Sequence, residues 1–312
     1  MEYTHKPVLL DACIQALNIR PDGIYVDGTL GRAGHSREIA GRLTTGRLIC
    51  IDRDQAAIDA AQDRLAPWLA RVTLIHSNFS ELKEVLSRCG VSGADGMLFD
   101  LGVSSPQLDD ASRGFSYMQD APLDMRMDTS APLSAADIVN TWSQEELRRI
   151  LFEYGEERYA PAIARAIVRA RETAPVKTTL VEIIKSAMPP AALREKQHPA
   201  KRSFQAIRIA VNGELDALPP MLRAAVDGLN PGGRLAVITF HSLEDRIVKR
   251  TLAELARGCV CPPEFPVCVC GKKPQVRLVT RKPVTAGGAE LEENPRARSA
   301  KLRVAEKCGF DL

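Results

Sequence analysis

Three aspartates in the first hundred residues each end a short apolar run, and the first of them opens a glycine-rich turn. They are Asp27, which begins residues 27–35 (DGTLGRAGH), and the later Asp52 and Asp100. Glycine has no Cβ, so such a turn lets backbone amides approach a ligand closely. Asp52 is placed to accept hydrogen bonds from the hydroxyls of a ribose, and Phe79 follows the third run, where its ring would lie near an adenine. These residue types in this order predict a site for an adenosine-containing cofactor.

Two cofactor classes fit these residues. The glycines of the turn follow the spacing G-x-x-G-x-x-G, and Asp52 lies 24 residues after Gly28. A nicotinamide dinucleotide also needs glycines followed by an acid, but its usual pattern is G-x-G-x-x-G. Asp27 precedes the glycines, and further candidate site residues follow the next three apolar runs. This arrangement resembles that of the class I S-adenosylmethionine fold. An NAD-dependent oxidoreductase is the competing hypothesis, and a purely structural turn is the alternative for the glycines alone.

The apolar runs are predicted to be strands of an α/β, doubly wound sheet. The first four alternate with helical stretches, as in βαβ units, and each is nearly continuous in apolar residues, as strands covered on both faces are. No such run occurs between Leu101 and Arg234, which predicts a helical insertion after the fourth strand. The last two strands are expected to form an antiparallel hairpin. The predicted strands are Ile24–Asp27, Leu48–Asp52, Val72–His76, Gly96–Leu101, Arg234–Phe240, Val276–Thr280 and Lys301–Glu306.

Helix signals occur within the insertion and after it. Ser143 and Glu146 have the spacing of a capping box and precede an apolar helical run. Across residues 204–229, apolar residues recur every three or four positions, which predicts an amphipathic helical segment. Pro219 and Pro220 are expected to kink or divide it, because proline removes a helical hydrogen bond.

His241 directly follows the strand predicted at residues 234–240. It is a candidate acid or base for a substrate. The simpler prediction is a helix start, because Ser242 and Asp245 have capping-box spacing. The sequence therefore assigns no catalytic role to His241.

Composition restricts the class of protein. The chain has 312 residues, of which 45% are hydrophobic and 26% charged, as in a globular protein with one large domain or one domain plus an insertion. It has no apolar run of about 18 residues and no signal-peptide core, so neither a membrane span nor secretion is predicted. Eight cysteines are too few for a disulfide scaffold of this length, which favours a reduced, cytoplasmic protein.

Four of the cysteines are clustered in a proline-rich segment. Cys259, Cys261, Cys268 and Cys270 form the pattern C-x-C-x6-C-x-C. Four soft ligands suit tetrahedral zinc, but the commoner zinc-finger spacing is C-x2-C and no histidine completes a familiar pattern. A zinc site and a reduced loop both remain open, and no metal is assigned.

Charge is segregated along the chain, although the net charge is only +3. From Arg158 to Arg208 there are 11 Lys or Arg against 3 Asp or Glu, and from Gly271 to Leu312 there are 10 against 5. The rest of the chain is acidic. Two basic segments beside an acidic remainder favour a polyanion-binding surface, with nucleic acid as the obvious partner, over a solvated helix face.

Several longer motifs resemble one family across almost the whole chain. The chain is similar to the bacterial 16S rRNA cytosine-N4-methyltransferase family (RsmH, formerly MraW). The motifs that carry the resemblance are residues 3–9 (YTHKPVL), 99–107 (FDLGVSSPQ), 113–117 (RGFSY), 122–128 (PLDMRMD), 198–204 (HPAKRSF), 240–246 (FHSLEDR) and 294–299 (NPRARS).

The resemblance implies a fold, a cofactor and a substrate. The fold is the class I S-adenosylmethionine-dependent methyltransferase fold, with that domain at residues 1–105 and 204–312 and a helical, substrate-recognising insertion at 106–203. The reaction is transfer of a methyl group to the exocyclic amine of a cytidine in the decoding centre of 16S rRNA, within the small ribosomal subunit. The implied S-adenosyl-L-methionine positions are Ala33, Gly34, His35, Asp52, Phe79, Asp100 and Gln107. Such families commonly have Gly where Ala33 stands, a substitution that costs little unless the backbone there has a positive φ.

The chemistry of an exocyclic amine agrees with the residues present. The lone pair of the cytosine N4 amine is delocalised into the ring, so an enzyme must orient the amine and accept its hydrogen bonds. Asp100, with Ser104, is the candidate acceptor, although Asp100 serving only the cofactor is an equal alternative. Methylation at carbon 5 would need a cysteine nucleophile near the cofactor, and no Pro-Cys or Thr-Cys dipeptide occurs in the chain.

A cytidine in a helix hides its amine, so the target must be single-stranded, splayed or flipped. Basic residues from both positively charged segments are candidate phosphate contacts. A noncatalytic RNA-binding ribosome assembly factor is the alternative function that these residues also allow. The candidate RNA-binding residues are Arg165, Arg169, Lys201, Arg202, Arg208, Arg296 and Arg298.

Overall fold

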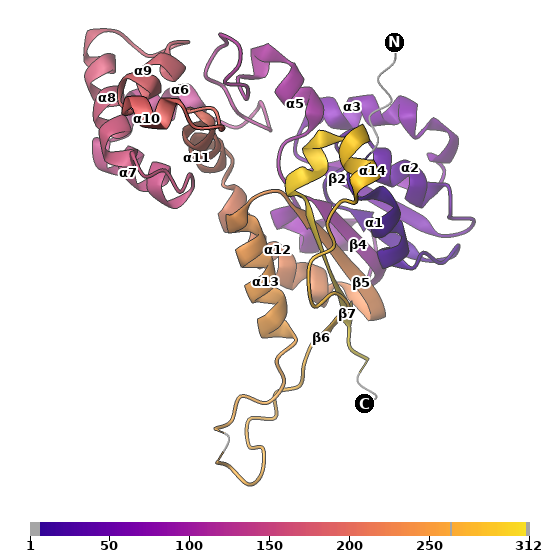
Figure 1. Cartoon of the computed structure of the whole chain (residues 1–312). Coiled ribbons are helices and arrows are strands. Elements are labelled where there is room, and N and C mark those ends of the chain that lie inside the picture. Colours follow the sequence, from indigo (N-terminus) through magenta and orange to yellow (C-terminus); the bar gives the residue numbers. More distant parts are fainter. Residues whose placement is uncertain (1–6, 263, 310–312) are drawn as a thin grey trace. The chain divides into compact units, whose positions relative to one another are not determined.

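The computed structural model describes residues 7–262 and 264–309, so Tyr3 to Lys6 of the N-terminal motif lie outside the described residues. Its centre is a seven-stranded sheet in the order β3-β2-β1-β4-β5-β7-β6 (Figure 1). The strands are β1 (Ile24–Asp27), β2 (Arg47–Asp52), β3 (Val72–His76), β4 (Ala94–Asp100), β5 (Leu229–Thr239), β6 (Val276–Leu278) and β7 (Lys301–Lys307).

All seven predicted strands are confirmed, and the sheet is mostly parallel. Strands β1 to β5 pair in parallel, and β7 runs antiparallel to both β5 and β6. The last two strands therefore pair antiparallel, as predicted. They do not form a tight hairpin, because helix α14 (Gly288–Glu293) and the 3₁₀ turn η4 (Pro295–Ser299) lie between them in the chain. Because the first four strands run in parallel, the residues that follow them meet at one edge of the sheet.

The chain divides into two compact units. Unit 1 comprises Met1–Gly102 and Leu215–Leu312 and holds the sheet, and unit 2 comprises Val103–Glu214. The remaining elements of unit 1 are α1 (Leu10–Leu17), α2 (Gly34–Ala40), α3 (Gln55–Arg64), η1 (Ala66–Trp68), η2 (Phe79–Glu81), α4 (Leu82–Arg88), α12 (Glu214–Asp227, which begins at the boundary) and α13 (Ser242–Leu255).

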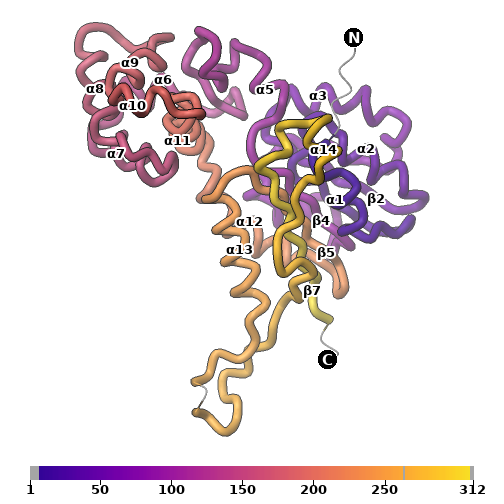
Figure 2. The backbone as a smooth tube through the Cα atoms, viewed as in Figure 1, coloured from indigo at the N-terminus to yellow at the C-terminus, as the bar shows by residue number. Residues whose placement is uncertain are grey.

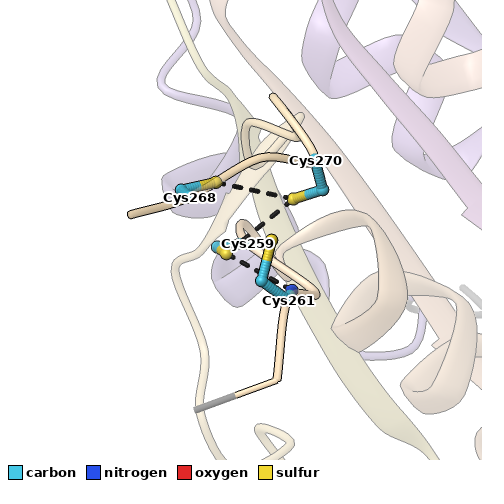
Figure 3. A group of neighbouring side chains, drawn as sticks. All are labelled: Cys259, Cys261, Cys268 and Cys270. Atoms are coloured by element: carbon cyan, nitrogen blue, oxygen red, sulfur yellow. Dashed lines mark hydrogen bonds between the residues drawn. The ribbon is translucent and has the colours of Figure 1, made fainter. Parts of the chain in front are cut away.

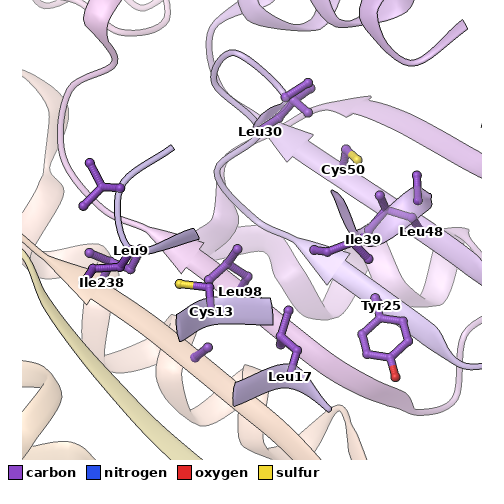
Figure 4. Close-up of a cluster of buried hydrophobic side chains, with 14 of the residues drawn as sticks. Leu9, Cys13, Leu17, Tyr25, Leu30, Ile39, Leu48, Cys50, Leu98 and Ile238 are labelled. Atoms are coloured by element: carbon purple, nitrogen blue, oxygen red, sulfur yellow. The ribbon is translucent and has the colours of Figure 1, made fainter. Parts of the chain in front are cut away.

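One hydrophobic cluster of unit 1 packs helices against the sheet (Figure 4). Cys13 and Leu17 of α1 are buried together with Tyr25, Leu48 and Leu98 from three neighbouring strands. Apolar residues on the helix side meet the continuous apolar runs of the strands, which is the packing that the sequence pattern predicts. The sheet is therefore a rigid base for the residues at its edge.

Unit 2 is helical and has its own core. All residues between β4 and β5 are described, and none of them forms a strand. Buried side chains from several of its helices, among them Ile138, Leu147, Ile163 and Ile207, form one cluster. Its elements are α5 (Ser105–Asp109), η3 (Ala111–Arg113), α6 (Ala135–Thr141), α7 (Gln144–Glu153), α8 (Ala160–Thr173), α9 (Leu180–Ser186), α10 (Pro190–Leu193) and α11 (Lys201–Asn212).

Two predictions about this region need correction. The insertion was predicted to end at residue 203, but that position lies inside α11, whose Phe204, Ile207 and Val211 pack in the helical core. The amphipathic segment is divided at Gly213, which ends α11 in the left-handed conformation, whereas Pro219 and Pro220 lie inside α12. A glycine with a positive φ ends a helix without a Cβ penalty, so the break falls there.

Helix starts agree with the capping signals in part. Ser143 caps α7 in a capping box with Glu146, as predicted. At α13 the box is made by His241 and Glu244 instead of the predicted Ser242 and Asp245. In the described part of the chain, no helix has both the length and the apolar composition needed to cross a membrane.

Candidate active site

Asp27 anchors the glycine-rich turn after β1. Its carboxylate is buried and accepts hydrogen bonds from the Thr29 N–H at 3.1 Å and the Ser36 hydroxyl at 2.6 Å. Burial raises the pKa of Asp27, and these two hydrogen bonds partly offset that effect. Thr29 and Ser36 lie on either side of Gly31 and Gly34 in the sequence, so Asp27 binds the turn at two points.

Asp52, at the end of β2, also binds the turn. Its Oδ2 accepts the Gly31 N–H at 2.8 Å, and its Oδ1 accepts the Asp54 N–H at 2.9 Å. Burial raises the pKa of Asp52 to about 6. Each carboxylate oxygen has a second lone pair, so both can still accept a hydroxyl hydrogen bond. The structure thus brings the turn and Asp52 together, as the spacing predicts.

Ala33 adopts a backbone conformation that favours glycine. Its φ is 58° and its ψ 23°, which places it in the left-handed region directly before α2. The sequence analysis expected alanine at this position to cost little stability unless the backbone φ is positive. The φ is positive, so the cost applies. An L-residue in this conformation costs about 1–2 kcal/mol. The Cβ of Ala33 is buried in the hydrophobic cluster of unit 1 that packs helices against the sheet, and its contacts there offset part of that cost.

His35, in the first turn of α2, is a neutral histidine. Its Nε2 lies 3.0 Å from the Val8 carbonyl oxygen, so Nε2 carries the proton and donates it. Burial lowers the pKa of His35 to about 4. Its Nδ1 lies 3.8 Å from Asp100 Oδ2, which is too far for a hydrogen bond. His35 therefore connects the turn to the N-terminal segment and brings no positive charge to Asp100.

Asp100, at the end of β4, has a buried carboxyl oxygen without a partner. Its backbone N–H donates to the Thr29 hydroxyl at 2.6 Å, while its side chain is 25% exposed. Among the described residues, nothing hydrogen-bonds to Asp100 Oδ1. Burial, together with the smaller effects of the Asp27 and Glu244 charges, raises the pKa of Asp100 to about 8. An unsatisfied buried acceptor is costly, so this oxygen fits a site completed by a ligand with a hydrogen-bond donor or a positive charge.

Phe79 lies beyond the third strand, where its position predicts it. It opens the turn η2, which Asn78 caps through a hydrogen bond to the Ser80 N–H at 3.0 Å. The ring is half-buried and meets Phe99 edge on, with centroids 6.1 Å apart and an interplanar angle of 85°. This edge-to-face contact fixes the orientation of the Phe79 ring relative to Phe99.

Ser104 and Gln107 belong to unit 2, where they start helix α5. They form a capping box, and Gln107 Oε1 accepts the Ser104 N–H at 3.0 Å. The Gln107 side chain is buried. Sequence reasoning assigned Ser104 to catalysis and Gln107 to the cofactor, and the structure shows a helix-starting role for both.

Three residues near the acids were missed by the sequence analysis. Thr29 and Ser36 bind Asp100 and Asp27 directly, and Glu244 is buried close enough to raise the pKa of Asp100. Glu244 accepts the backbone N–H of Phe240 at 2.8 Å, so it belongs to the turn after β5. Its place three residues after His241 was the available signal, because that is the spacing of a capping box.

The predicted RNA-binding residues differ in their contacts. Arg165 and Arg169 are exposed one turn apart on α8. Lys201 and Arg202 are exposed at the start of α11, and Arg202 also donates to the Glu156 carbonyl oxygen at 3.0 Å. Arg296 and Arg298 are exposed in η4 of unit 1.

Arg208, by contrast, has its guanidinium in an ion pair. Its Nε and Nη2 donate to the two carboxylate oxygens of Glu214 at 2.8 and 2.9 Å, and the arginine side chain is only 16% exposed. A planar bidentate pair of this kind is strong. The structure therefore shows a structural use of Arg208, at the end of α11.

Aromatic residues and acids of the insertion also have internal contacts. Phe115 is buried in the helical core. Tyr117 stacks on His198, with ring centroids 4.7 Å apart and planes 19° from parallel. Asp124 and Arg126 form an ion pair at 2.7 Å. Phe115 is therefore part of the packed core of the helical unit.

Comparison with known proteins decides the family. A family model described as the MraW methylase family matches residues 2–308. The chain belongs to this family. It is 58% identical over 310 residues to the ribosomal RNA small subunit methyltransferase H of Brevibacillus brevis, covering 98% of this chain and 99% of that protein. The protein of the same name from Clostridioides difficile is 53% identical over 310 residues, covering 98% of this chain and all of that one. A solved structure, the putative rRNA-methylase from Clostridium thermocellum, aligns over 97% of this chain and 99% of that chain at 12% identity, with a TM-score of 0.45.

Membership of the MraW methylase family confirms the predicted enzyme class. The chain is a methyltransferase with the class I fold, and S-adenosylmethionine is its methyl donor. The NAD-dependent oxidoreductase hypothesis is therefore wrong. The unpartnered Asp100 oxygen and the acids around it suit a positively charged sulfonium donor, so the residues present fit this cofactor.

Proposed function

We propose that this enzyme methylates the N4 amine of a cytidine in the decoding centre of 16S rRNA, within the small ribosomal subunit of the cytoplasm. Relatives at 53–58% identity over almost their whole length are named as methyltransferases of small-subunit ribosomal RNA, which supports ribosomal RNA as the substrate. We further propose that the methylated base is a cytidine, that its N4 amine receives the methyl group, and that it lies in the decoding centre. The observation that carries the amine is the unpartnered carboxyl oxygen of Asp100.

The proposed cofactor contacts come from unit 1 and from Gln107. Asp52 would accept the ribose hydroxyls, Phe79 would stack on the adenine, and Ala33, Gly34 and His35 would line the turn. Gln107 is proposed as a further cofactor residue on the family resemblance alone, and its Oε1 accepts the Ser104 N–H. When bound, S-adenosylmethionine supplies a methyl group made electrophilic by the adjacent sulfonium.

Asp100 is proposed to orient the amine. Without a bound cation nearby, its pKa of about 8 would leave it protonated at neutral pH. A cation bound beside a carboxyl lowers its pKa, so the loaded site would hold Asp100 as a carboxylate. A carboxylate accepts an N–H hydrogen bond from the amine, directs the nitrogen lone pair away from the base, and can receive the proton that the amine loses on methylation.

The rest of the substrate is proposed to be held through phosphates and shape. Arg165, Arg169, Lys201 and Arg202 are exposed cations of the helical unit, and Arg296 and Arg298 are exposed cations of unit 1. Phosphate contacts of this kind position RNA without reading its sequence. We assign Arg208 a smaller part, because its guanidinium is held by Glu214. Ser104 remains a second candidate acceptor for the amine, through its hydroxyl at the start of α5.

The test is transfer of labelled methyl from S-adenosylmethionine to purified small subunits that lack this modification, followed by nucleoside mass analysis. Label in N4-methylated cytidine at a decoding-centre position is the expected result. Label in another nucleoside would overturn the amine chemistry. Absence of label on subunits and on naked rRNA, with cofactor binding intact, would instead favour the noncatalytic RNA-binding assembly factor.

The role of Asp100 is tested by Asp100→Asn, which keeps the shape and removes the charge. If Asp100 orients the amine, kcat should fall by about 100-fold or more, the usual contribution of a positioned acid or base, while the Kd of the cofactor changes much less. A large rise in the cofactor Kd with kcat unchanged would show that Asp100 serves the cofactor only. Ser104→Ala is the comparison variant for the second candidate acceptor.

A further inference from the structure

The four clustered cysteines converge outside the site described above. Cys259, Cys261, Cys268 and Cys270 lie in the loop between α13 and β6, and their Sγ atoms all lie within 4.8 Å of one another (Figure 3). Figure 2 shows this loop as a long excursion of the chain before it returns to the sheet. The methyltransferase site uses none of these thiols.

The sulfur positions match a tetrahedral metal site. The Sγ of Cys270 is 3.6 Å from that of Cys268 and 3.8 Å from that of Cys259. Four sulfurs at about 2.3 Å from a central zinc ion would be separated by about 3.8 Å from one another in a tetrahedron. All eight cysteines are described and free, so the four sulfurs surround a common point without being joined in pairs.

Backbone amides point at the same sulfurs. The Val260 N–H donates to Cys270 Sγ at 3.4 Å, and the Val269 N–H donates to Cys261 Sγ at 3.3 Å. These two contacts cross between the two Cys-Val-Cys segments, so each segment supports a sulfur of the other. Amide hydrogen bonds of this kind stabilise negative charge on metal-bound thiolates and fix ligand orientation.

The described residues around the cysteines include exposed apolar side chains. Val267 is 71% exposed and Val269 is 73% exposed, and three of the four cysteines are exposed as well. Phe265 is 50% exposed as well. Residues i and i+2 of an extended chain share one side, so each Cys-Val-Cys segment can present two sulfurs together and its valine away from them. A small segment that buries few apolar side chains gains order from a cross-link such as a bound metal ion.

We propose that Cys259, Cys261, Cys268 and Cys270 bind one structural zinc ion. Four thiolates leave no open coordination position, so the ion holds the loop and takes no part in methyl transfer. The C-x-C spacing is shorter than that of common zinc fingers, and the crossed pairing of the two segments compensates for it by supplying two ligands from each side. The Lys272 and Lys273 side chains follow the last ligand in sequence and add positive charge beside the doubly negative zinc–thiolate centre.

Metal content of the full chain tests the proposal. The protein is purified under reducing conditions without a metal-affinity step, and its zinc and iron are measured by elemental mass spectrometry. About one zinc per chain is expected. The variant Cys268→Ser/Cys270→Ser should lose the zinc, while Cys89→Ser/Cys308→Ser, which changes two half-buried cysteines elsewhere, should keep it. Circular dichroism of both variants shows whether the sheet and helices are intact. We expect them to be, because none of the four loop cysteines belongs to the hydrophobic cluster of unit 1.

Two further readouts separate the alternatives. Alkylation of the native protein should spare the four loop cysteines until a chelator is added, and cobalt substituted for zinc should give the visible absorption of a tetrahedral thiolate site. Stoichiometric iron would overturn the choice of zinc. Loop thiols that are fully alkylated without a chelator, or joined in disulfides by mass in the reduced preparation, would overturn the metal site altogether.

Discussion

At the scale of single residues, the site is a cluster of carboxyl groups whose pKa values are raised mainly by burial, and the charge of Asp27 adds to this effect at Asp52 and Asp100. Asp27, Asp52 and Asp100 end neighbouring strands, and Glu244 adds its charge near Asp100. The sequence predicts that the three aspartates lie at one edge of the sheet, because each ends an apolar run that is a predicted strand. It could not predict Glu244, whose burial depends on the turn after β5. The acids place negative charge where a sulfonium cofactor would be attracted.

Asp100 makes the stability of the cofactor-free protein depend on pH. Its pKa is about 8 when folded, against an ordinary value of 3.8. Between these values the unfolded state loses the proton and the folded state keeps it, so the free energy of unfolding falls as pH rises. Asp100→Asn removes this penalty. Its gain in stability over the wild type should therefore increase from pH 4 to pH 8, by at least the ~1.4 kcal/mol of one pKa unit.

Urea unfolding of both proteins at several pH values measures this difference. Comparing the two proteins cancels the pH dependence of the acids that they share. A stability gap that is constant from pH 4 to pH 8 would contradict the raised pKa of Asp100. Adding S-adenosylmethionine should reduce the gap, since a bound cation favours the carboxylate of the wild type.

The turn contains a matched pair of residues with positive φ. Gly31 has a φ of 48°, and a Cβ added there would meet only the Thr29 carbonyl oxygen, at 3.8 Å. Gly31→Ala should therefore destabilise the protein by about 1 kcal/mol through backbone strain alone. Ala33→Gly relieves similar strain but removes a buried methyl group worth about 0.8 kcal/mol, so its effect should be close to zero. Thermal unfolding of both variants checks the contrast, and a Gly31→Ala protein as stable as the wild type would refute it.

At the scale of elements, long apolar runs made the strands predictable, whereas helix ends depended on single residues. All seven strands agree with the sequence pattern, and the last two pair antiparallel as predicted. The end of α11 does not, because Gly213 interrupts an apolar periodicity that continues into α12. Two prolines nearby are the stronger sequence signal for a break, and yet they lie inside the second helix. The backbone conformation of Gly213, with φ at 58°, decided the boundary.

Strand β7 depends on an ion pair with α13. Asp245 accepts hydrogen bonds from Arg303 at 2.7 and 3.1 Å, and Arg303 is buried. Burial alone would raise the pKa of Asp245, but the hydrogen bond and charge of Arg303 outweigh it and lower the pKa. Asp245→Ala leaves a buried guanidinium with its best partner removed, so it should destabilise the protein by about 3 kcal/mol.

A double variant and an exposed pair provide the controls. Asp245→Ala/Arg303→Met should recover more than half of the lost stability, because no buried charge remains. Glu254→Ala breaks the exposed Arg223–Glu254 pair and should change stability by less than about 0.5 kcal/mol. Equal losses for Asp245→Ala and Glu254→Ala in urea unfolding would show that the Asp245 pair has no special weight.

At the scale of the whole molecule, the chain combines a sheet unit that carries the candidate catalytic acids with a helical unit rich in exposed cations. Segregation of charge along the sequence predicted where the cations would be. It could not say which of them are used inside the fold, because ion pairs form between residues that only the structure brings together. Arg208 is the example, since its pair with Glu214 spans the end of α11. The proposed RNA contacts therefore give Arg208 less weight than the exposed cations.

Salt dependence of RNA binding tests this division of the cations. Each phosphate neutralised by the protein contributes about 0.7 to the slope of log affinity against log salt for single-stranded nucleic acid. Arg165→Ala/Arg169→Ala should therefore reduce the slope for an rRNA fragment by about 1.4 and weaken binding most at low salt. The control variant Arg42→Ala/Arg148→Ala also removes two positive charges, here from exposed ion pairs with Glu38 and Glu145. It should leave the slope unchanged. Equal changes in the two proteins would mean that net charge alone attracts the RNA, whereas a change confined to the α8 pair would assign that helix to the phosphate contacts.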